Sequence, residues 1–274
     1  MRTLVQPGPV AQERIDTCRG TVERIRFRAS KGTTVLDGLT GPMVAAGFQS
    51  GTMTLRDASV GPFQYVMPGP PDGPAHVAYF SAPRAPEGVS RIGQANATFG
   101  WNAERPFLHC HAIWTEPDGS ARGGHIVPPE TVFASDTDVE AWGFRDIRMD
   151  VSPDAETGFS LFQPNGGTDR GAVFARVKPN VDFVTAVEDI AARCGMRDAV
   201  VRGSLGSLVG AVFVDGPSVP DYATEVLVAS GSVRDGQATL DLHVVGMDGR
   251  SHSGRLARGE NAVLITFDLV LEPV

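Results

Sequence analysis

The chain carries the same succession of sequence features twice, and this internal repeat constrains its fold more than any other property. In the second half, an amphipathic stretch at 181–194 ends at Gly195 and is followed by short segments rich in β-branched residues. In the first half, a similar stretch ends near Gly47 and is followed by segments of the same kind. The length of 274 residues suits two domains of ordinary size. We therefore expect two copies of one domain, at 20–150 and 170–274.

The second copy shows the pattern most clearly. Phe183, Val187, Ile190 and Cys194 have helical spacing, and Asn180 or Asp182 could cap the first turn. Five strands should follow, at 199–201, 209–214, 224–230, 239–245 and 262–271.

The last of these strands alternates between apolar and polar residues. Its apolar face would contain Val263, Ile265, Phe267, Leu269 and Leu271, and the other face would contain Thr266, Asp268 and Glu272. This alternation predicts an antiparallel sheet that is buried on one face only.

The first copy repeats this order more loosely. Thr34 and Asp37 resemble a capping box, and Leu36, Leu39 and Met43 would share one side of the helix that follows. Strand-like segments come next, interrupted by a Pro/Gly-rich insertion at 68–74; they lie at 52–55, 63–67, 95–101 and 107–115. The two halves together predict an α+β protein in which each copy packs an amphipathic helix on a large antiparallel sheet.

Composition excludes several classes of protein. The 32 glycines and 20 prolines indicate many turns between short elements, and the net charge of −8 disfavours non-specific binding to DNA. Three separated cysteines without a CxxC pair indicate neither a disulfide framework nor a zinc knuckle. No stretch has the length of a membrane span, and the N-terminus lacks the apolar region of a signal peptide. We expect a cytoplasmic protein with no membrane partner.

Three of the six histidines fall in one short segment. His109 and His111 are two residues apart, so on a strand they share a face, with Cys110 on the other. A hairpin centred near Asp118 would place His125 opposite His111, so that all three imidazoles could converge. Such a set predicts an open metal site, with Zn²⁺ the first choice and another divalent transition metal possible. The alternative is three ordinary histidines on a sheet surface.

The second copy has a motif that corresponds to the histidine segment. Leu108-His109-Cys110-His111, Asp118-Gly119 and Gly124-His125 correspond to Leu240-Asp241-Leu242-His243, Asp248-Gly249 and Gly254-Arg255. Asp241 and Arg255 then stand at two of the three ligand positions, and a guanidinium would repel a cation. We expect no metal at His243, and ordinary polar roles for His76 and His252.

These motifs resemble the plants and prokaryotes conserved (PPC) domain. The likeness rests on Leu108-His109-Cys110-His111, on Gly123-Gly124-His125 and on the helices that end in glycine, and it covers nearly the whole chain as two tandem copies. The resemblance implies an α+β fold, assembly into trimers and, in bacterial members, a metal held by His109, His111 and His125. Plant members add an AT-hook and take part in nuclear DNA-associated complexes; this chain has no Arg-Gly-Arg-Pro segment.

A few charged residues are weaker candidates for the site. Arg24, Arg26 and Arg28 alternate along one predicted strand, as either a solvated edge or an anion site. Glu130 and Glu225 could support the metal or transfer protons, or could be purely structural.

Three functions remain open, and we give them in order of preference. The first is a metal-binding module for a small-molecule or anionic ligand, or for assembly. The second is a metal-dependent hydrolase or lyase acting on a small anionic substrate. The third is a DNA-associated regulator, which rests on the resemblance alone; direct nucleic-acid binding is not expected.

Overall fold

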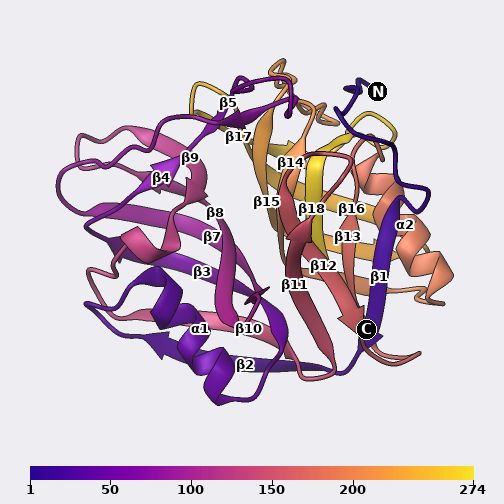
Figure 1. Ribbon diagram of the computed structural model, residues 1–274, viewed down its shortest axis with the longest axis horizontal. Helices are drawn as coiled ribbons and strands as arrows, with labels where there is room; N and C mark the ends of the chain where they lie inside the picture. Colours follow the sequence, from indigo (N-terminus) through magenta and orange to yellow (C-terminus); the bar gives the residue numbers. More distant parts are fainter.

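Two antiparallel sheets lie face to face in the computed structural model, which describes residues 1–274 (Figure 1). The first sheet comes from the first half of the chain, with helix α1 (Val35–Ala45) packed on it. The second comes from the second half and packs on helix α2 (Phe183–Arg193). No helix has the length and apolar character required to cross a membrane.

The strands of the two sheets follow one plan. The first sheet has the order β2-β10-β3-β7-β8-β9-β4, where the strands are β2 (Val22–Ala29), β3 (Ser50–Val60), β4 (Tyr65–Val66), β7 (Ser90–Asn102), β8 (Arg105–Thr115), β9 (Ala121–Ile126) and β10 (Thr137–Phe144). The second has the order β1-β13-β18-β14-β15-β16-β17, where the strands are β1 (Ile15–Gly20), β13 (Ala172–Val177), β14 (Ala199–Leu208), β15 (Thr224–Arg234), β16 (Gln237–Val245), β17 (Ser251–Arg255) and β18 (Val263–Pro273).

This shared plan confirms the duplication. Six neighbouring strands of the first sheet have the order β2-β10-β3-β7-β8-β9. Their counterparts in the second sheet have the same order, β13-β18-β14-β15-β16-β17. The helix lies between the first and second strands of each copy in sequence. The predicted α+β fold of two tandem copies is therefore correct.

Four short strands and one helical turn lie outside this plan. They are β5 (Pro68–Gly69), β6 (Tyr79–Phe80), β11 (Ile147–Pro153), β12 (Ser160–Gly166) and the 3-10 turn η1 (Pro128–Glu130). Strands β11 and β12 form a hairpin in the connection between the copies, and β5, at the start of the predicted insertion, pairs with β6, which lies beyond its end. Strand β1 precedes the first copy in sequence but pairs with β13 at the edge of the second sheet (Figure 1).

Both helices begin and pack as their sequences predict. The Thr34 hydroxyl accepts a hydrogen bond from the Asp37 backbone N–H at 3.0 Å, and the Asp182 carboxylate accepts one from the Thr185 N–H at 2.9 Å. Phe183 of α2 stacks on Phe267 of β18 with ring centroids 3.7 Å apart. The caps settle where each helix starts, and the apolar side of each helix covers one face of its sheet.

The prediction that the second sheet is buried on one face only is wrong. Thr266 and Asp268, on the polar face of β18, are 5% and 1% exposed. The polar face of each sheet packs against the polar face of the other, and the Asn96 amide donates to the Ser204 and Val228 carbonyls at 2.9 and 2.8 Å. Polar residues here satisfy one another across an interface instead of facing water.

The predicted strand at 209–214 is also wrong. Strand β14 continues from Ala199 to Leu208 and ends before Gly210, whose φ of +70° lies in the left-handed region; only isolated bridges at Ala211 and Phe213 follow. The strand includes Gly206, where a Cβ would lie 2.5 Å from the Thr266 carbonyl oxygen. Glycine in this strand permits close approach of β18, so it does not end the strand.

Candidate metal centre

The three clustered histidines lie on the hairpin of β8 and β9. His111 is directly opposite His125 in the register of the hairpin, as the turn at Asp118 predicts. The side chains of His109, His111 and His125 offer ligand nitrogens that all lie within 4.8 Å of one another. Cys110 points to the other face and is fully buried in the core beneath α1. The hairpin alone therefore brings the three imidazoles together.

Hydrogen bonds to the second copy orient two of these rings. The Nδ1 atom of His109 is 2.8 Å from the Asp268 carboxylate on β18, and Nδ1 of His111 is 2.9 Å from the Val226 carbonyl on β15. A carbonyl or a carboxylate can only accept, so each Nδ1 carries the proton. Nε2 of each ring then points to the centre of the cluster, which is the orientation that a metal ligand requires.

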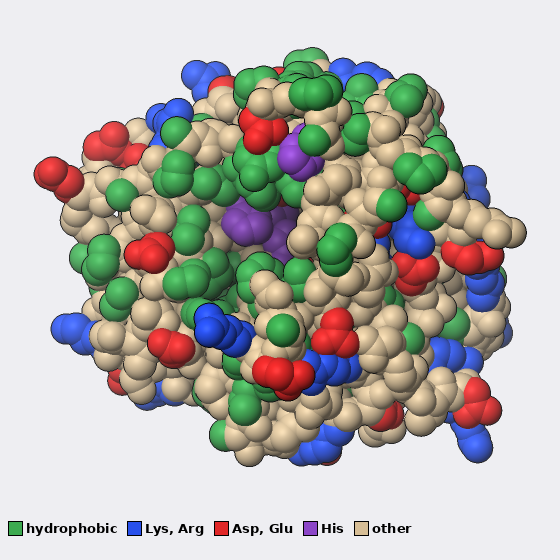
Figure 2. Space-filling model, in the orientation of Figure 1, with side chains coloured by type: hydrophobic (Ala, Val, Ile, Leu, Met, Phe, Trp, Pro, Cys, Tyr) green, Lys and Arg blue, Asp and Glu red, His purple; other side chains and the backbone are tan.

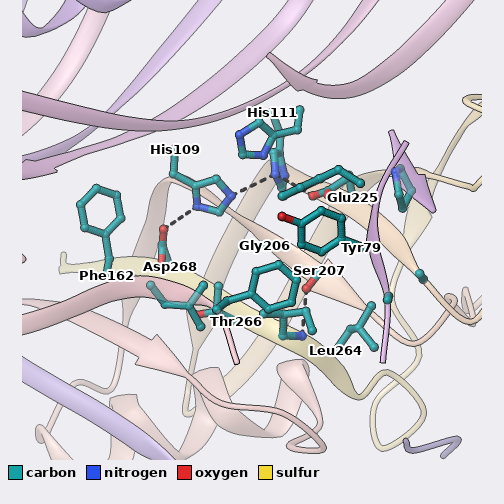
Figure 3. A pocket seen from close by; sticks show the side chains of 18 of the residues that line it. Tyr79, His109, His111, Phe162, Gly206, Ser207, Glu225, Leu264, Thr266 and Asp268 are labelled. Carbon is teal, nitrogen blue, oxygen red and sulfur yellow. Dashed lines mark hydrogen bonds and ion pairs between the residues drawn. The ribbon is translucent and has the colours of Figure 1, made fainter. Parts of the chain in front are cut away.

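The two Nε2 atoms face each other closely. They are 3.0 Å apart, and the two rings are perpendicular (Figure 3). Two lone pairs at that distance repel unless a proton or a cation lies between them. Ligand nitrogens about 2.0–2.1 Å from a tetrahedral zinc would be roughly 3.3 Å apart. The observed spacing fits a shared divalent ion.

His125 completes the set. Its ring centroid is 5.3 Å from that of His109 and 5.2 Å from that of His111, and its buried Nδ1 has no hydrogen-bond partner. Burial, with the adjacent His111 and His109 rings, holds the pKa of His125 well below its usual value. A neutral imidazole with a buried, unpaired nitrogen is ready to bind a metal.

Glu225 of β15 reaches the centre from the second copy. Its carboxylate oxygen is 2.6 Å from Nε2 of His111. Burial alone would lower the pKa of His111, but the Glu225 carboxylate and the Val226 carbonyl outweigh it, so the pKa is raised. Glu225 can accept a hydrogen bond at the centre or act as a fourth ligand, and either role stabilises positive charge there.

The centre forms the floor of a pocket between the two copies. Figure 2 shows histidine side chains at the bottom of a hollow with hydrophobic side chains around it. The cavity has a volume of about 230 Å³. Its aromatic residues come from β6, from β8 and from the connection between the copies: Tyr79, Phe80, Phe107, Phe159 and Phe162. A concave, largely apolar space with a few convergent polar groups is typical of a small-molecule site.

Other residues considered from the sequence lie outside this pocket. Arg24 and Arg26 form ion pairs with Glu140 on the neighbouring strand β10, and Glu130 is exposed in η1. His76 pairs with Asp72 at 3.0 Å, and His252 lies on β17. The structure does not bring Arg24, Arg26 or Glu130 to the three histidines.

The second copy differs from the first at every ligand position. Asp241 lies opposite Arg255 in the hairpin of β16 and β17, as His111 lies opposite His125. Asp241 and not His243 is therefore the counterpart of His111, which corrects the alignment made from the motif. The two side chains form an ion pair at 3.2 Å. The Asp241–Arg255 ion pair thus stands where the first copy has His111 and His125. The His243 ring forms a hydrogen bond with the Ser253 hydroxyl.

Sequence reasoning missed Asp268 and the aromatic residues that line the pocket, which we call the aromatic wall (Tyr79, Phe80, Phe107, Phe159 and Phe162). Asp268 was placed only on the polar face of the last strand, although a single acid within the apolar run 263–271 is a signal of a buried, paired carboxylate. Phe159 and Phe162 lie in the segment between the two predicted copies, 20–150 and 170–274. Nothing in their local sequence indicates that they face a pocket.

Comparison with known proteins finds likeness only among solved structures. No family model matches the chain, and no curated protein matches it. A metal-containing protein from Archaeoglobus fulgidus is 14% identical, with a TM-score of 0.43, and the match covers 53% of this chain and 96% of that one. A PPC protein from Pyrococcus horikoshii is 13% identical, with a TM-score of 0.42, and the match covers 57% and 97%.

A third solved structure gives the same picture. It is a protein from Bacteroides thetaiotaomicron for which DNA binding is supposed, 12% identical with a TM-score of 0.39, and the match covers 53% of this chain and 97% of that one. Each neighbour is covered almost completely and spans about half of this chain. One of these three neighbours, the protein from Pyrococcus horikoshii, is a PPC protein.

Proposed function

We propose that this chain is a tandem PPC-domain protein whose first copy binds one divalent transition metal through His109, His111 and His125, and that the metal anchors a small ligand in the pocket above it. Zinc is the expected ion, because three imidazoles and an open position suit its tetrahedral coordination. The observation that carries the proposal is the pair of Nε2 atoms turned toward each other at 3.0 Å.

The hydrogen bonds around the cluster support this proposal. The Asp268 carboxylate and the Val226 carbonyl accept from Nδ1 of His109 and His111, so both rings keep a fixed orientation. Such outer partners are a regular part of histidine metal sites. The unpaired oxygen Oδ1 of Asp268 and Nδ1 of His125 are the buried polar atoms at the centre that no protein group satisfies.

Elemental analysis of protein purified without an affinity tag tests this function. We expect close to one metal ion per chain in the wild type and almost none in His125→Ala, because the loss of one of three ligands removes most of the affinity. His243→Ala is the matched control: it changes a histidine of the second copy whose ring lies outside the cluster, and it should keep the wild-type metal content. Equal metal in wild type and His125→Ala would refute the site.

A second candidate is a metal-dependent hydrolase or lyase, and the position of Glu225 favours it. A bound divalent ion would polarise a carbonyl or activate water. The carboxylate 2.6 Å from Nε2 of His111 could accept a proton beside that position. The earlier expectation of an anionic substrate drew on nearby arginines, and Arg24 and Arg26 bind Glu140 instead.

Glu225→Gln separates the two candidates. If Glu225 accepts a proton, this variant should retain its metal and lose about 100-fold or more in turnover on any substrate found by screening, in line with the usual contribution of a general base. The measurement is kcat together with metal content for the same sample. Unchanged kcat at full metal content would show that Glu225 is not the base, whereas a screen that finds no metal-dependent turnover would leave binding as the function.

Partners follow from charge and from the family resemblance. We expect a homo-oligomer, a trimer if the PPC resemblance extends to assembly, and no direct contact with nucleic acid. The net charge of −8 opposes binding to a polyanion. The one groove rich in arginine, with Arg26, Arg28 and Arg56, also contains Asp138 and Glu140, which form ion pairs with two of these arginines.

A further inference from the structure

We infer that the pocket above the three histidines selects a neutral, mostly apolar molecule of about one ring, which presents a single uncharged coordinating atom to the metal. This inference rests on the proposed function, since it names the class of ligand for the same site. It replaces the anionic ligand expected from the sequence.

The charges of the pocket lining exclude an anion as the preferred ligand. The lining contains no Lys or Arg; its only charged residues besides the histidines are Glu225 and Asp268. A divalent ion would be balanced by these two carboxylates, so a neutral guest would leave the site without net charge. An anionic guest would place an uncompensated negative charge in a low-dielectric space, which is costly.

The buried guanidinium of Arg176, behind the pocket, already has a carboxylate partner, although its Nη1 makes no hydrogen bond. Arg176 is 0% exposed and lies on β13, behind Thr266, whose hydroxyl accepts from its Nε at 3.2 Å. Its Nη2 binds the Asp154 carboxylate at 2.8 Å. Arg176 is absent from the lining, so it does not supply the missing positive charge.

Aromatic side chains line the path from the histidines to the pocket mouth. The Phe80 ring lies 5.2 Å from that of His125, and Tyr79 stacks on Phe159 at 5.7 Å between centroids. On the side of His109, Phe107 meets Phe162 edge to face at 5.7 Å. Leu264, which is labelled in Figure 3, and Ile265 also line the pocket. A guest bound to the metal would therefore bury its remaining atoms against apolar groups.

The cavity volume limits the size of the guest. An apolar cavity of roughly 150 Å³ accepts benzene. This cavity, at about 230 Å³, has room for one aromatic ring together with a small coordinating group.

Titration of the Co²⁺-loaded protein with two neutral nitrogen ligands tests the inference. Imidazole and 4-phenylimidazole share a coordinating atom and differ by a phenyl group, and both are neutral at about pH 8. The d–d absorption of Co²⁺ reports coordination directly and requires no turnover. We expect 4-phenylimidazole to bind about 10- to 100-fold more tightly than imidazole, as burial of one aromatic group predicts. Benzoate and inorganic phosphate should bind more weakly than 4-phenylimidazole.

Substitutions in the aromatic wall test whether the preference for 4-phenylimidazole over imidazole arises from the pocket. Phe159→Ala should reduce the advantage of the phenyl group to a few-fold, while Phe27→Ala on β2, outside the pocket, should leave it unchanged. Phe107→Ala serves as the second variant, because Phe107 is 39% exposed and its loss should not prevent folding.

The outcomes separate this inference from the metal site itself. If Co²⁺ fails to bind, or binds equally to His111→Ala, then the proposed function fails. If Co²⁺ binds through His111 but the two imidazoles bind equally, or benzoate or phosphate binds as tightly as 4-phenylimidazole, then only the preference for a neutral apolar guest is overturned. A preference that survives both Phe159→Ala and Phe107→Ala would also contradict it.

Discussion

Removal of the bound metal by a chelator should lower the midpoint of thermal unfolding by roughly 8–16 °C, because an ion that binds only the folded chain adds about 4 kcal/mol at a free concentration 1,000-fold above its Kd. His109, His111 and His125 come from one copy and their partners Asp268, Val226 and Glu225 from the other. Metal binding should therefore stabilise the packing of the two copies as well as the hairpin.

Differential scanning calorimetry of the wild type, once at a fixed free metal concentration and once after a chelator has removed the metal, measures this shift. His125→Ala should unfold at the same temperature in both conditions, because it lacks the binding site. His243→Ala should behave like the wild type, since its imidazole lies outside the cluster. A wild-type midpoint that does not move when elemental analysis shows complete metal removal would contradict the proposed linkage.

Asp154→Ala should lower the free energy of unfolding by about 3–5 kcal/mol, the usual cost of leaving one member of a buried ion pair without its partner. Its partner Arg176 is 0% exposed, and the two groups are 2.8 Å apart. Burial alone would raise the pKa of Asp154, but Arg176 and Thr157 outweigh it and hold that pKa below its usual value. The contribution of the pair is therefore present above the ordinary pKa of Asp and is lost as the pH falls through the folded-state value.

Urea denaturation of Asp154→Ala, Arg176→Met and the double variant measures this interaction. The double variant should be more stable than the sum of the two single changes predicts, because no charge is left buried alone. Asp138→Ala, which breaks the exposed pair with Arg28, should have a much smaller effect. Additive single and double effects would show that the Asp154–Arg176 pair does not act as a unit.

The two copies have diverged into unequal roles around one pocket. The first copy contributes the three imidazoles, and the second contributes Glu225 and Asp268 together with Ser207 and Thr266. In the hairpin of the second copy, Asp241 and Arg255 occupy the positions that correspond to His111 and His125. Their side chains form an ion pair. The second copy thus lacks the three imidazoles and supplies the groups that hydrogen-bond to those of the first copy.

The features that the sequence predicted correctly depend on short-range rules. Capping by Thr34 and Asp182 follows from local hydrogen bonding, and the pairing of His111 with His125 follows from the turn between them. The same rule explains the misalignment of His243: the motif letters suggested it as the counterpart of His111, but the turn sets the register and pairs Asp241 with Arg255.

The contacts between the histidines and the second copy depend on long-range packing. His109 meets Asp268, and His111 meets Glu225, across sequence separations over which no periodicity carries information. Two sheets with polar inner faces can pack at several angles, and alternation along a strand shows which residues share a face but not what that face will contact. Local patterns in this chain therefore determine the repeat and the three converging imidazoles, whereas the packing of one sheet on the other supplies the carboxylates and the aromatic wall, and leaves the pocket lining without Lys or Arg.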